Sequence, residues 1–348
     1  MINRLFGAFV LLMTLNSFAL TLDEKIGQMI IVGFKGDNIN NTRKIQKQIQ
    51  KGEISGVILF NKNLKSKEDL IKMNEKFLSL NKITPFIAID NEGGMIQRHD
   101  YFSNLSAKET SQLKEDEAQK EYEKMADSLK ELKFNTNFAP VVDLELNKKS
   151  IISIKKRSYS DNPKIVSKYA KIFIDEHNKK NIITSIKHFP GHGSIDVDTH
   201  LSFADATSTF KKEELEPYYD LKNYDKLNTV MVSHIFNSKF DNKHPASLSK
   251  KTIDYLKNDV GFNGVIISDD MDMGAIKNNY TLDETLRLSI NSGVNVLIFS
   301  NNIKFYDRNI VKKIHKSIKK QVKSGEIDIE NIDASCEKIL ELKKNIEK

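Results

Sequence analysis

The chain is organised around residues 182–200, which read IITSIKHFPGHGSIDVDTH. The apolar run Ile182–Ile186 is typical of a buried strand and ends in a Lys-His pair. Pro190 and two glycines then predict a loop, which carries two aspartates and ends at His200. Barrel and sheet enzymes hold their reactive groups in polar loops of this kind, at the ends of apolar strands. We therefore expect this stretch to carry the chemistry of the protein.

Eight apolar runs of strand length recur along the chain, with amphipathic segments of helical length between them. Most runs are continuous rather than alternating, which is typical of parallel strands covered on both faces. The runs are Met29–Phe34, Gly56–Phe60, Pro85–Asp90, Thr136–Leu144, Ile182–His188, Thr229–His234, Gly264–Asp269 and Val294–Ser300. This repetition predicts an α/β fold, a single (β/α)8 barrel of the TIM type. An open doubly wound sheet is the alternative, but it would show a glycine-rich phosphate turn after an early strand, and none is present.

Helical periodicity predicts the covering helices, and one of them lies beyond the last strand–helix unit. The expected helices are Thr42–Gln50, Ser66–Leu80, Ser106–Leu132, Pro163–Asn181, Lys211–Leu221, Ser249–Asp259, Leu282–Ser292, Phe305–Ser324 and Glu330–Ile346. The last is expected as an extra C-terminal helix. No linker and no shift of composition divides the chain, so one domain is expected.

The charge pattern and the cysteine content limit the binding partners and metal sites that we expect. The net charge is +7 and the pI is about 9.0, but lysines alternate with glutamates instead of clustering with aromatics. No nucleic-acid partner is therefore expected. The single cysteine, Cys336, excludes an internal disulfide and a cysteine-rich metal site.

The N-terminus resembles a secretory signal. Arg4 precedes the apolar run Leu5–Leu15, and small residues lead to a plausible cleavage site after Ala19. We expect residues 1–19 to be a signal peptide and residues 20–348 to be the catalytic barrel, exported to the periplasm or secreted. The run is too short for a stable membrane anchor. The alternative is an uncleaved helix packed on the fold.

Polar residues follow several of the predicted strands, and barrel closure would bring them around one mouth. Two arginines, a lysine and a carboxylate suit a polyhydroxy ligand, and these are Asp90, Arg98, Arg157 and Lys187. Asp269, at the end of another strand, is a carboxylate on a rigid element, as a nucleophile needs. His200 can give and take a proton near neutral pH, and Asp198 can orient its ring. This apparatus suits double displacement at an anomeric carbon, with His in place of the usual second carboxylate.

These motifs together resemble the β-N-acetylglucosaminidase branch of glycoside hydrolase family three. The motifs that carry the resemblance are residues 187–193 with 198–200, residues 90–94 with Arg98, residues 137–143 with 157–159, and residues 261–270. The resemblance spans residues 20–348 and implies a retaining exo-enzyme that removes terminal N-acetylglucosamine from peptidoglycan fragments. It implies Asp269 as nucleophile, His200 as acid/base assisted by Asp198, and Asp90, Arg98, Arg157, Lys187 and His188 as sugar ligands. It implies no metal and no cofactor, and a monomer is our separate expectation.

The sequence departs from that pattern in several places. Met95 stands where Arg or Lys is common, Asn295 replaces a frequent Asp, and no Pro follows His200 closely. A secretory signal is also unusual, since Gram-negative members of this branch are typically cytoplasmic. Glu92 is ambiguous, while Asp143 and His192 are expected to be structural.

Other functions stay open at this point. Five residues could be metal ligands in a barrel hydrolase, namely His188, His192, Asp196, Asp198 and His200. A related β-glycosidase or phosphorylase is also possible, as is a wall-binding protein without activity. The sequence leaves open the aglycone, the preferred chain length, the acceptor and the oligomeric state.

Overall fold

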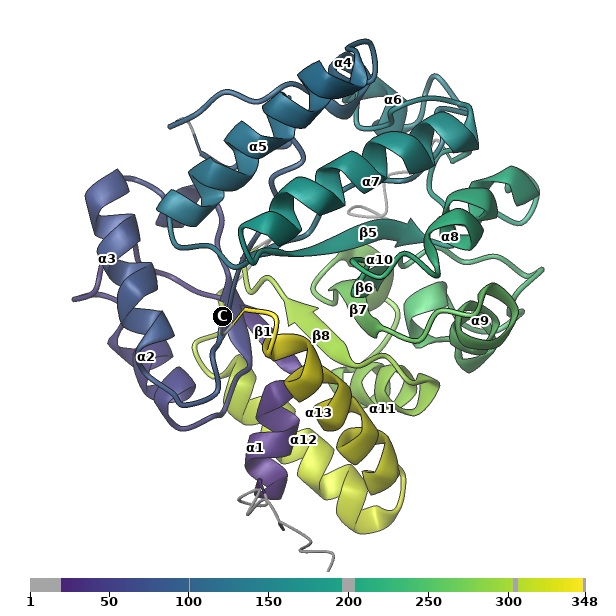
Figure 1. The fold of residues 1–348 in the computed structure, drawn as a ribbon. Coiled ribbons are helices and arrows are strands. Elements are labelled where there is room, and N and C mark those ends of the chain that lie inside the picture. Colours follow the sequence, from purple (N-terminus) through teal and green to yellow (C-terminus); the bar gives the residue numbers. More distant parts are fainter. Residues whose placement is uncertain (1–19, 100, 196–203, 303–305, 347–348) are drawn as a thin grey trace, which may run out of the picture.

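The computed structural model describes residues 20–99, 101–195, 204–302 and 306–346. Eight parallel strands close into a barrel in the order of the sequence, which confirms the predicted fold (Figure 1). The strands are β1 (Ile30–Gly33), β2 (Gly56–Ile58), β3 (Phe86–Ile89), β4 (Thr136–Asn137), β5 (Ile183–Phe189), β6 (Thr229–Val232), β7 (Val265–Asp270) and β8 (Val296–Phe299). Each strand pairs with the next in parallel register, and β8 pairs with β1.

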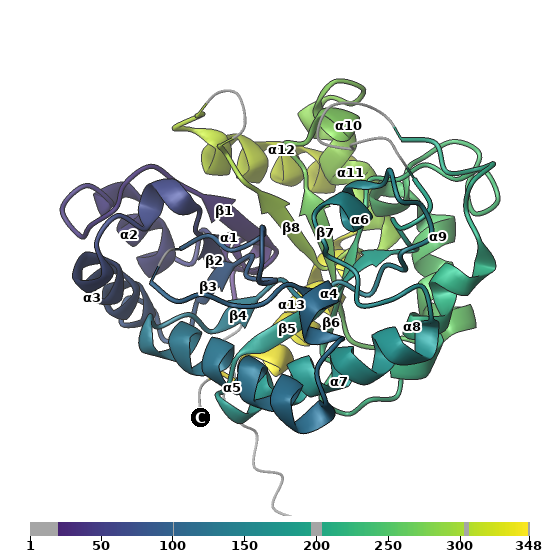
Figure 2. The same ribbon diagram turned by 90° about the horizontal axis from the view of Figure 1, so that it is seen from above.

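Helices surround the barrel on its outer wall (Figures 1 and 2). The covering helices are α2 (Arg43–Gln50), α3 (Lys67–Leu78), α5 (Glu115–Glu131), α7 (Pro163–Lys179), α8 (Glu216–Leu221), α9 (Lys250–Asp254) with a π-helical continuation at Tyr255–Val260, α11 (Leu282–Ser292) and α12 (Ile310–Ser324). Shorter helices lie in the loops, namely α4 (Ala107–Thr110), α6 (Ile151–Ile154), α10 (Gly274–Lys277) and the 3-10 helices Asn61–Asn63 (η1), Lys212–Leu215 (η2) and Ala246–Leu248 (η3).

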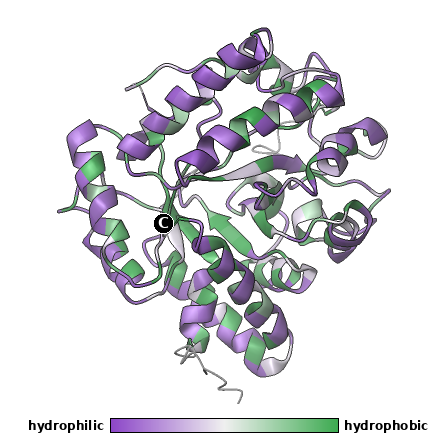
Figure 3. Ribbon diagram, in the orientation of Figure 1, coloured by the Kyte–Doolittle hydropathy of each residue, from purple (hydrophilic) through white to green (hydrophobic). Residues whose placement is uncertain are grey.

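Burial explains why the strands read as continuous apolar runs. Every residue of β1, β5 and β8 is buried, because one face lines the barrel and the other meets the helices. Figure 3 shows the contrast between apolar strands and helices with hydrophilic outer faces. Burial of both strand faces supplies the main hydrophobic stabilisation of the fold.

The extra C-terminal helix is confirmed as α13 (Ile329–Lys343), which packs against α1 (Leu22–Gln28). The buried Lys343 Nζ donates to Gln28 Oε1 at 2.8 Å and to Ser55 O at 3.0 Å. These partners precede β1 and β2, so α13 closes the amino-terminal end of the barrel. In the described part of the chain, every helix is too short or too polar to cross a membrane.

Two local expectations were wrong, and one helix was missed. The predicted strand Thr136–Leu144 is regular only at β4, because Pro140 lacks the N–H that a parallel ladder needs. The predicted helix Ser106–Leu132 divides into α4 and α5. Helix α1 was missed, although Thr21 and Glu24 form the capping box that could have revealed it.

Candidate active site

A cavity of about 300 Å³ opens at the carboxyl ends of the strands, where barrel enzymes hold their reactive groups. Six residues expected from the sequence line it, namely Asp90, Arg98, Arg157, Lys187, His188 and Asp269. They come from the ends of β3, β5 and β7 and from the loops after β3 and β4. Asp198 and His200, the expected acid/base pair, lie outside the described residues. The roles of all eight stay predictions.

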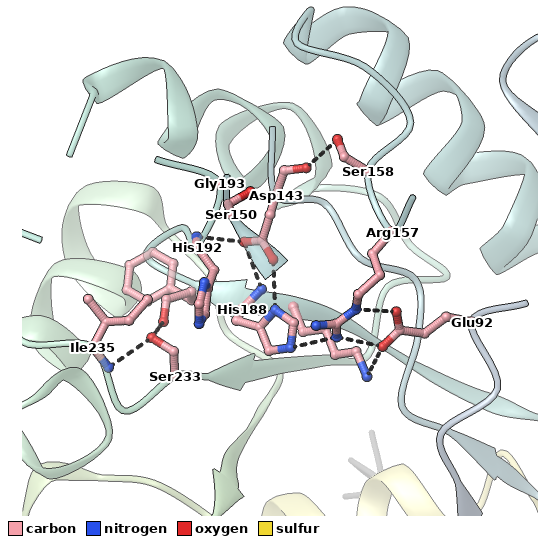
Figure 4. Close-up of polar contacts among 12 residues, drawn as sticks. Glu92, Asp143, Ser150, Arg157, Ser158, His188, His192, Gly193, Ser233 and Ile235 are labelled. Atoms are coloured by element: carbon pink, nitrogen blue, oxygen red, sulfur yellow. Dashed lines mark hydrogen bonds and ion pairs between the residues drawn. The ribbon is translucent and has the colours of Figure 1, made fainter. Parts of the chain in front are cut away.

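A network of buried and partly buried ion pairs connects the loops of this cavity, and Figure 4 shows the part around Glu92. Lys187 Nζ lies 3.0 Å from Asp90 Oδ1 and 2.7 Å from Glu92 Oε1. Arg157 donates to both oxygens of Glu92, each at 2.7 Å, in a bidentate pair. Arg98 Nη2 completes the network 3.3 Å from Asp90 Oδ2. Glu92, ambiguous in the sequence, is thus the carboxylate that joins two of the expected sugar ligands.

The network holds its charges at neutral pH. Burial alone would raise the pKa of Glu92, but Arg157 and Lys187 outweigh it and hold that pKa below its ordinary value. Burial opposes the charge of Lys187 in the same way, yet Asp90 and Glu92 raise its pKa. Asp90 follows the same pattern, because Lys187 and Arg98 lower its pKa against burial. The cavity therefore presents fixed donors and acceptors to a ligand.

Asp143 orients His188. Its Oδ2 lies 2.7 Å from His188 Nδ1, and its Oδ1 accepts the backbone N–H of His188 and of His192. Arg157 Nη2 lies 3.3 Å from His188 Nε2. Because a guanidinium can only donate, we assign Nε2 as acceptor and Nδ1–H as donor to Asp143. Asp143 was expected to be structural, and it is the residue that sets the tautomer of a cavity-lining histidine.

His192 also lines the cavity, although the sequence suggested only a role in shaping the loop. Burial lowers its pKa to about 4, and the nearby His188 adds to this effect. The ring is therefore neutral at physiological pH. His192 therefore has two roles: it shapes the turn, and its neutral ring forms part of the cavity lining.

The two aspartates at the end of β7 have different surroundings. Asp270 Oδ1 accepts the N–H of Ser300 at 2.8 Å and of Asp272 at 3.1 Å, so it joins β7 to β8. Burial raises the pKa of Asp270 to about 7, and Asp272 adds to the rise. Asp269 lines the cavity and its Oδ1 accepts the N–H of Asp270 at 2.8 Å. Asp270 lines the cavity as well, but its Oδ1 accepts two backbone amides near the strand ends, which gives this side chain a structural role.

The ring of His234 contacts the end of β7. Its Nδ1 lies 2.7 Å from Ser247 Oγ, and its Nε2 lies 2.8 Å from the backbone oxygen of Asp270. The sequence left His234 undecided between the cavity and the core. Its bond to the end of β7 favours a supporting role.

A larger groove of about 1000 Å³ lies between α1, α2 and α12. Lysines dominate its walls, including Lys44, Lys47, Lys312 and Lys316. It lies on the outer wall of the barrel and not at the strand ends. The smaller cavity is therefore the candidate active site.

Comparison with known proteins agrees with this geometry. Residues 21–342 match the family described as the glycosyl hydrolase family 3 N terminal domain. A β-hexosaminidase from Nitrosomonas eutropha is 28% identical over 286 residues, which cover 78% of this chain and 80% of that protein. An uncharacterized secreted glycosyl hydrolase from Arthroderma benhamiae is 26% identical over 318 residues, covering 87% of this chain and 89% of the relative.

The fold also matches a solved structure. A family 3 β-N-acetylglucosaminidase from Paenibacillus sp. FPU-7 superposes with a TM-score of 0.87 at 25% identity. The match covers 94% of this chain and 63% of that one, so the present chain spans less than two thirds of its length. The chain belongs to glycosyl hydrolase family 3 and is a glycoside hydrolase.

Proposed function

We propose that the protein is a retaining exo-β-N-acetylglucosaminidase, with residues 20–348 as the catalytic barrel. The observation that carries the proposal is one cavity in which Asp269 and the ion-paired network of Asp90, Glu92, Arg157 and Lys187 meet. Its volume of about 300 Å³ is at the lower end for ligand sites and suits a single sugar unit. Family membership and the names of the relatives support the same activity.

The proposed reaction has two displacements at the anomeric carbon. Asp269 attacks that carbon while the bond to the leaving oxygen breaks, and His200 gives this oxygen its proton. His200 then takes a proton from water, whose oxygen attacks the same carbon and releases Asp269. Asp198 orients the ring of His200 in both steps. Two inversions leave the β configuration unchanged.

Turnover of a chromogenic β-N-acetylglucosaminide, measured with and without a chelator, tests this function. We expect turnover that is insensitive to the chelator, and NMR should show the β anomer as the first product. Higher kcat/KM on a β-glucoside would favour a β-glucosidase, and faster turnover with phosphate that yields a sugar phosphate would favour a phosphorylase. Absence of any turnover would favour the wall-binding protein.

A metal-dependent hydrolase is the competing candidate, and the described residues among its ligands fit a metal ion poorly. Both ring nitrogens of His188 already have partners, in Asp143 and Arg157. Among the described residues, no group of three or more His, Cys, Asp or Glu side chains could hold a metal ion. Asp196, Asp198 and His200 lie outside those residues. Loss of turnover with the chelator would revive this candidate.

The proposed substrate is a peptidoglycan fragment whose leaving sugar bears a carboxylate. Lys155 lines the cavity beside the exposed Ile154, and it supplies a cation outside the buried network. Lys155→Glu should raise KM for a muramic-acid disaccharide by roughly three- to tenfold, through charge repulsion at a partly exposed site. KM for the neutral disaccharide of N-acetylglucosamine should change little.

The adjacent Lys156 offers a matched control, because it pairs with Glu109 at 2.9 Å and does not line the cavity. Lys156→Glu should leave both KM values near those of the wild type. Equal effects of Lys155→Glu on the charged and neutral substrates would contradict an anionic aglycone.

We also propose export, as a monomer without a membrane anchor. The support is the order of charged, apolar and small residues in 1–19, which lie outside the described part, and the secreted relative. N-terminal sequencing of the native protein should find Leu20 as the first residue. An intact Met1 in a cytoplasmic fraction would contradict this proposal.

A further inference from the structure

Glu214, in the 3-10 helix η2, is a buried carboxylate below the turn that follows β5. Its side chain has no exposed surface, and its Oε2 accepts the backbone N–H of Gly193 at 2.8 Å. The preceding N–H, that of His192, donates to Asp143 Oδ1 at 2.9 Å. Two consecutive amides of the turn are thus held by two different buried carboxylates. A buried carboxylate costs free energy, so its retention here calls for an explanation.

The turn is wedged between Glu214 and the loop that follows β4. A Cβ on Gly191, which has φ +142°, would lie 2.6 Å from Glu214 Cβ. On the other side, a Cβ on Gly193 would lie 1.8 Å from Leu144 O, and Gly193 O accepts the N–H of Asn147 at 3.1 Å. Only glycine allows such close approach on both sides. Glu214 is therefore in direct contact with the turn and packs against one side of it, while Leu144 packs against the other.

From this geometry we infer that Glu214 is a positioning residue of the active site. As a carboxylate, it holds residues 191–194 so that His192 and the His188–Asp143 pair stay aligned on the cavity. The same turn leads in sequence to Asp198 and His200. The inference rests on the proposed function, because its readout is turnover of a β-N-acetylglucosaminide.

The charge state of Glu214 decides how firmly its carboxyl group holds residues 191–194. Its oxygens face donors, since Oε1 faces the N–H of Lys211 at 3.5 Å, Oε2 accepts that of Gly193, and the nearby Ser194 hydroxyl also favours the charged form. Protonation would turn one acceptor oxygen into a hydroxyl facing an N–H, which weakens the hold. Burial raises the pKa of Glu214 to about 7, and the neighbouring Asp143 adds to the rise.

The other titratable groups around Glu214 do not cancel the rise in its pKa. Tyr218 of α8 is buried, and its raised pKa keeps it neutral. His192 is neutral because burial lowers its pKa to about 4, and Asp143 keeps its charge. Positioning by the carboxylate should therefore be present above about pH 7 and lost below it.

The free energy of unfolding should depend on pH in the opposite direction to this positioning effect. The pKa of Glu214 is raised from 4.5 to about 7 by folding, so between these values the unfolded chain is ionised and the folded one holds a proton. Stability therefore falls as pH rises through this window. Glu214→Gln removes that loss. The melting temperature of the variant minus that of the wild type should therefore be larger at pH 8 than at pH 5. A purely structural residue would not combine lower activity with this gain.

The test compares Glu214→Gln with the wild type between pH 5.5 and 8.5, using an aryl β-N-acetylglucosaminide with an acidic phenol. At pH 8, kcat/KM of the variant should be lower by on the order of 10- to 100-fold, the cost of a small misplacement. Below pH 6 the two proteins should converge. Glu176→Gln is the matched control, because Glu176 is also buried but lies in α7 and pairs with Lys179 at 2.6 Å.

Equal kcat/KM at every pH, or an equal loss at every pH, would overturn the inference. Inactivity of the wild type on every β-N-acetylglucosaminide would instead overturn the proposed function. Amide hydrogen exchange of Gly193 in the wild type gives a readout that needs neither activity nor a variant. After correction for the intrinsic rate, its protection should fall below pH 7. Constant protection would also contradict the inference.

Discussion

Asp269→Asn should leave the fold intact and lower turnover by several orders of magnitude. The amide has nearly the size of the carboxylate but is a poor nucleophile, so no covalent glycosyl-enzyme forms. Steady-state kinetics with an aryl β-N-acetylglucosaminide, together with a melting curve, measure both effects. Retention of more than about a tenth of the wild-type rate would mean that another group is the nucleophile.

Two additions sharpen this experiment. Asp270→Asn is the matched control, since its amide oxygen can still accept the N–H groups of Ser300 and Asp272, and its activity should fall far less. Azide added to Asp269→Ala should restore turnover by occupying the vacated space. A single displacement by azide inverts the anomeric carbon, so the product should be the α-glycosyl azide. A β-azide would contradict the position assigned to Asp269.

His200→Ala should produce a loss that depends on the leaving group. Natural disaccharides leave as poor alcohols that need a proton, so most of their turnover should disappear. Aryl glycosides with acidic phenols leave unaided, so their first step should be nearly normal. The second step lacks its base, and covalent intermediate should accumulate. Pre-steady-state burst size on the aryl substrate, compared with steady-state rates on the disaccharide, measures this contrast.

Asp198→Ala should show a weaker form of the same pattern, because it removes only the partner that orients the ring. Equal losses on both substrates, with no burst, would mean that His200 binds sugar or shapes the loop. Some other residue would then be the acid. Both residues lie outside the described part of the chain, so kinetics are the direct way to assign them.

The strands and the strand-end residues were predictable because their signals are local. A strand buried on both faces needs an apolar run, and six of the eight barrel strands lie entirely within a run expected from the sequence. Only β5 and β7 extend one residue further, to Phe189 and Asp270. Once eight such runs indicate a barrel, closure places Asp90, Lys187 and Asp269 at one mouth. Their common position at the cavity was therefore predicted without coordinates, while the roles proposed for them come from their chemistry and from the family resemblance.

The partners of those residues were decided only by the tertiary structure. Glu92 lies 65 residues from Arg157 in sequence, and Asp90 lies 97 residues from Lys187, so nothing local reveals either ion pair. Asp143 in a loop and Glu214 in an expected helix show the same limit, because nothing in the local sequence reveals that either carboxylate is buried against the turn after β5. Sequence patterns report which face of an element is buried. Charge pairing, tautomer and pKa depend on distances across the closed barrel, which chain folding alone establishes.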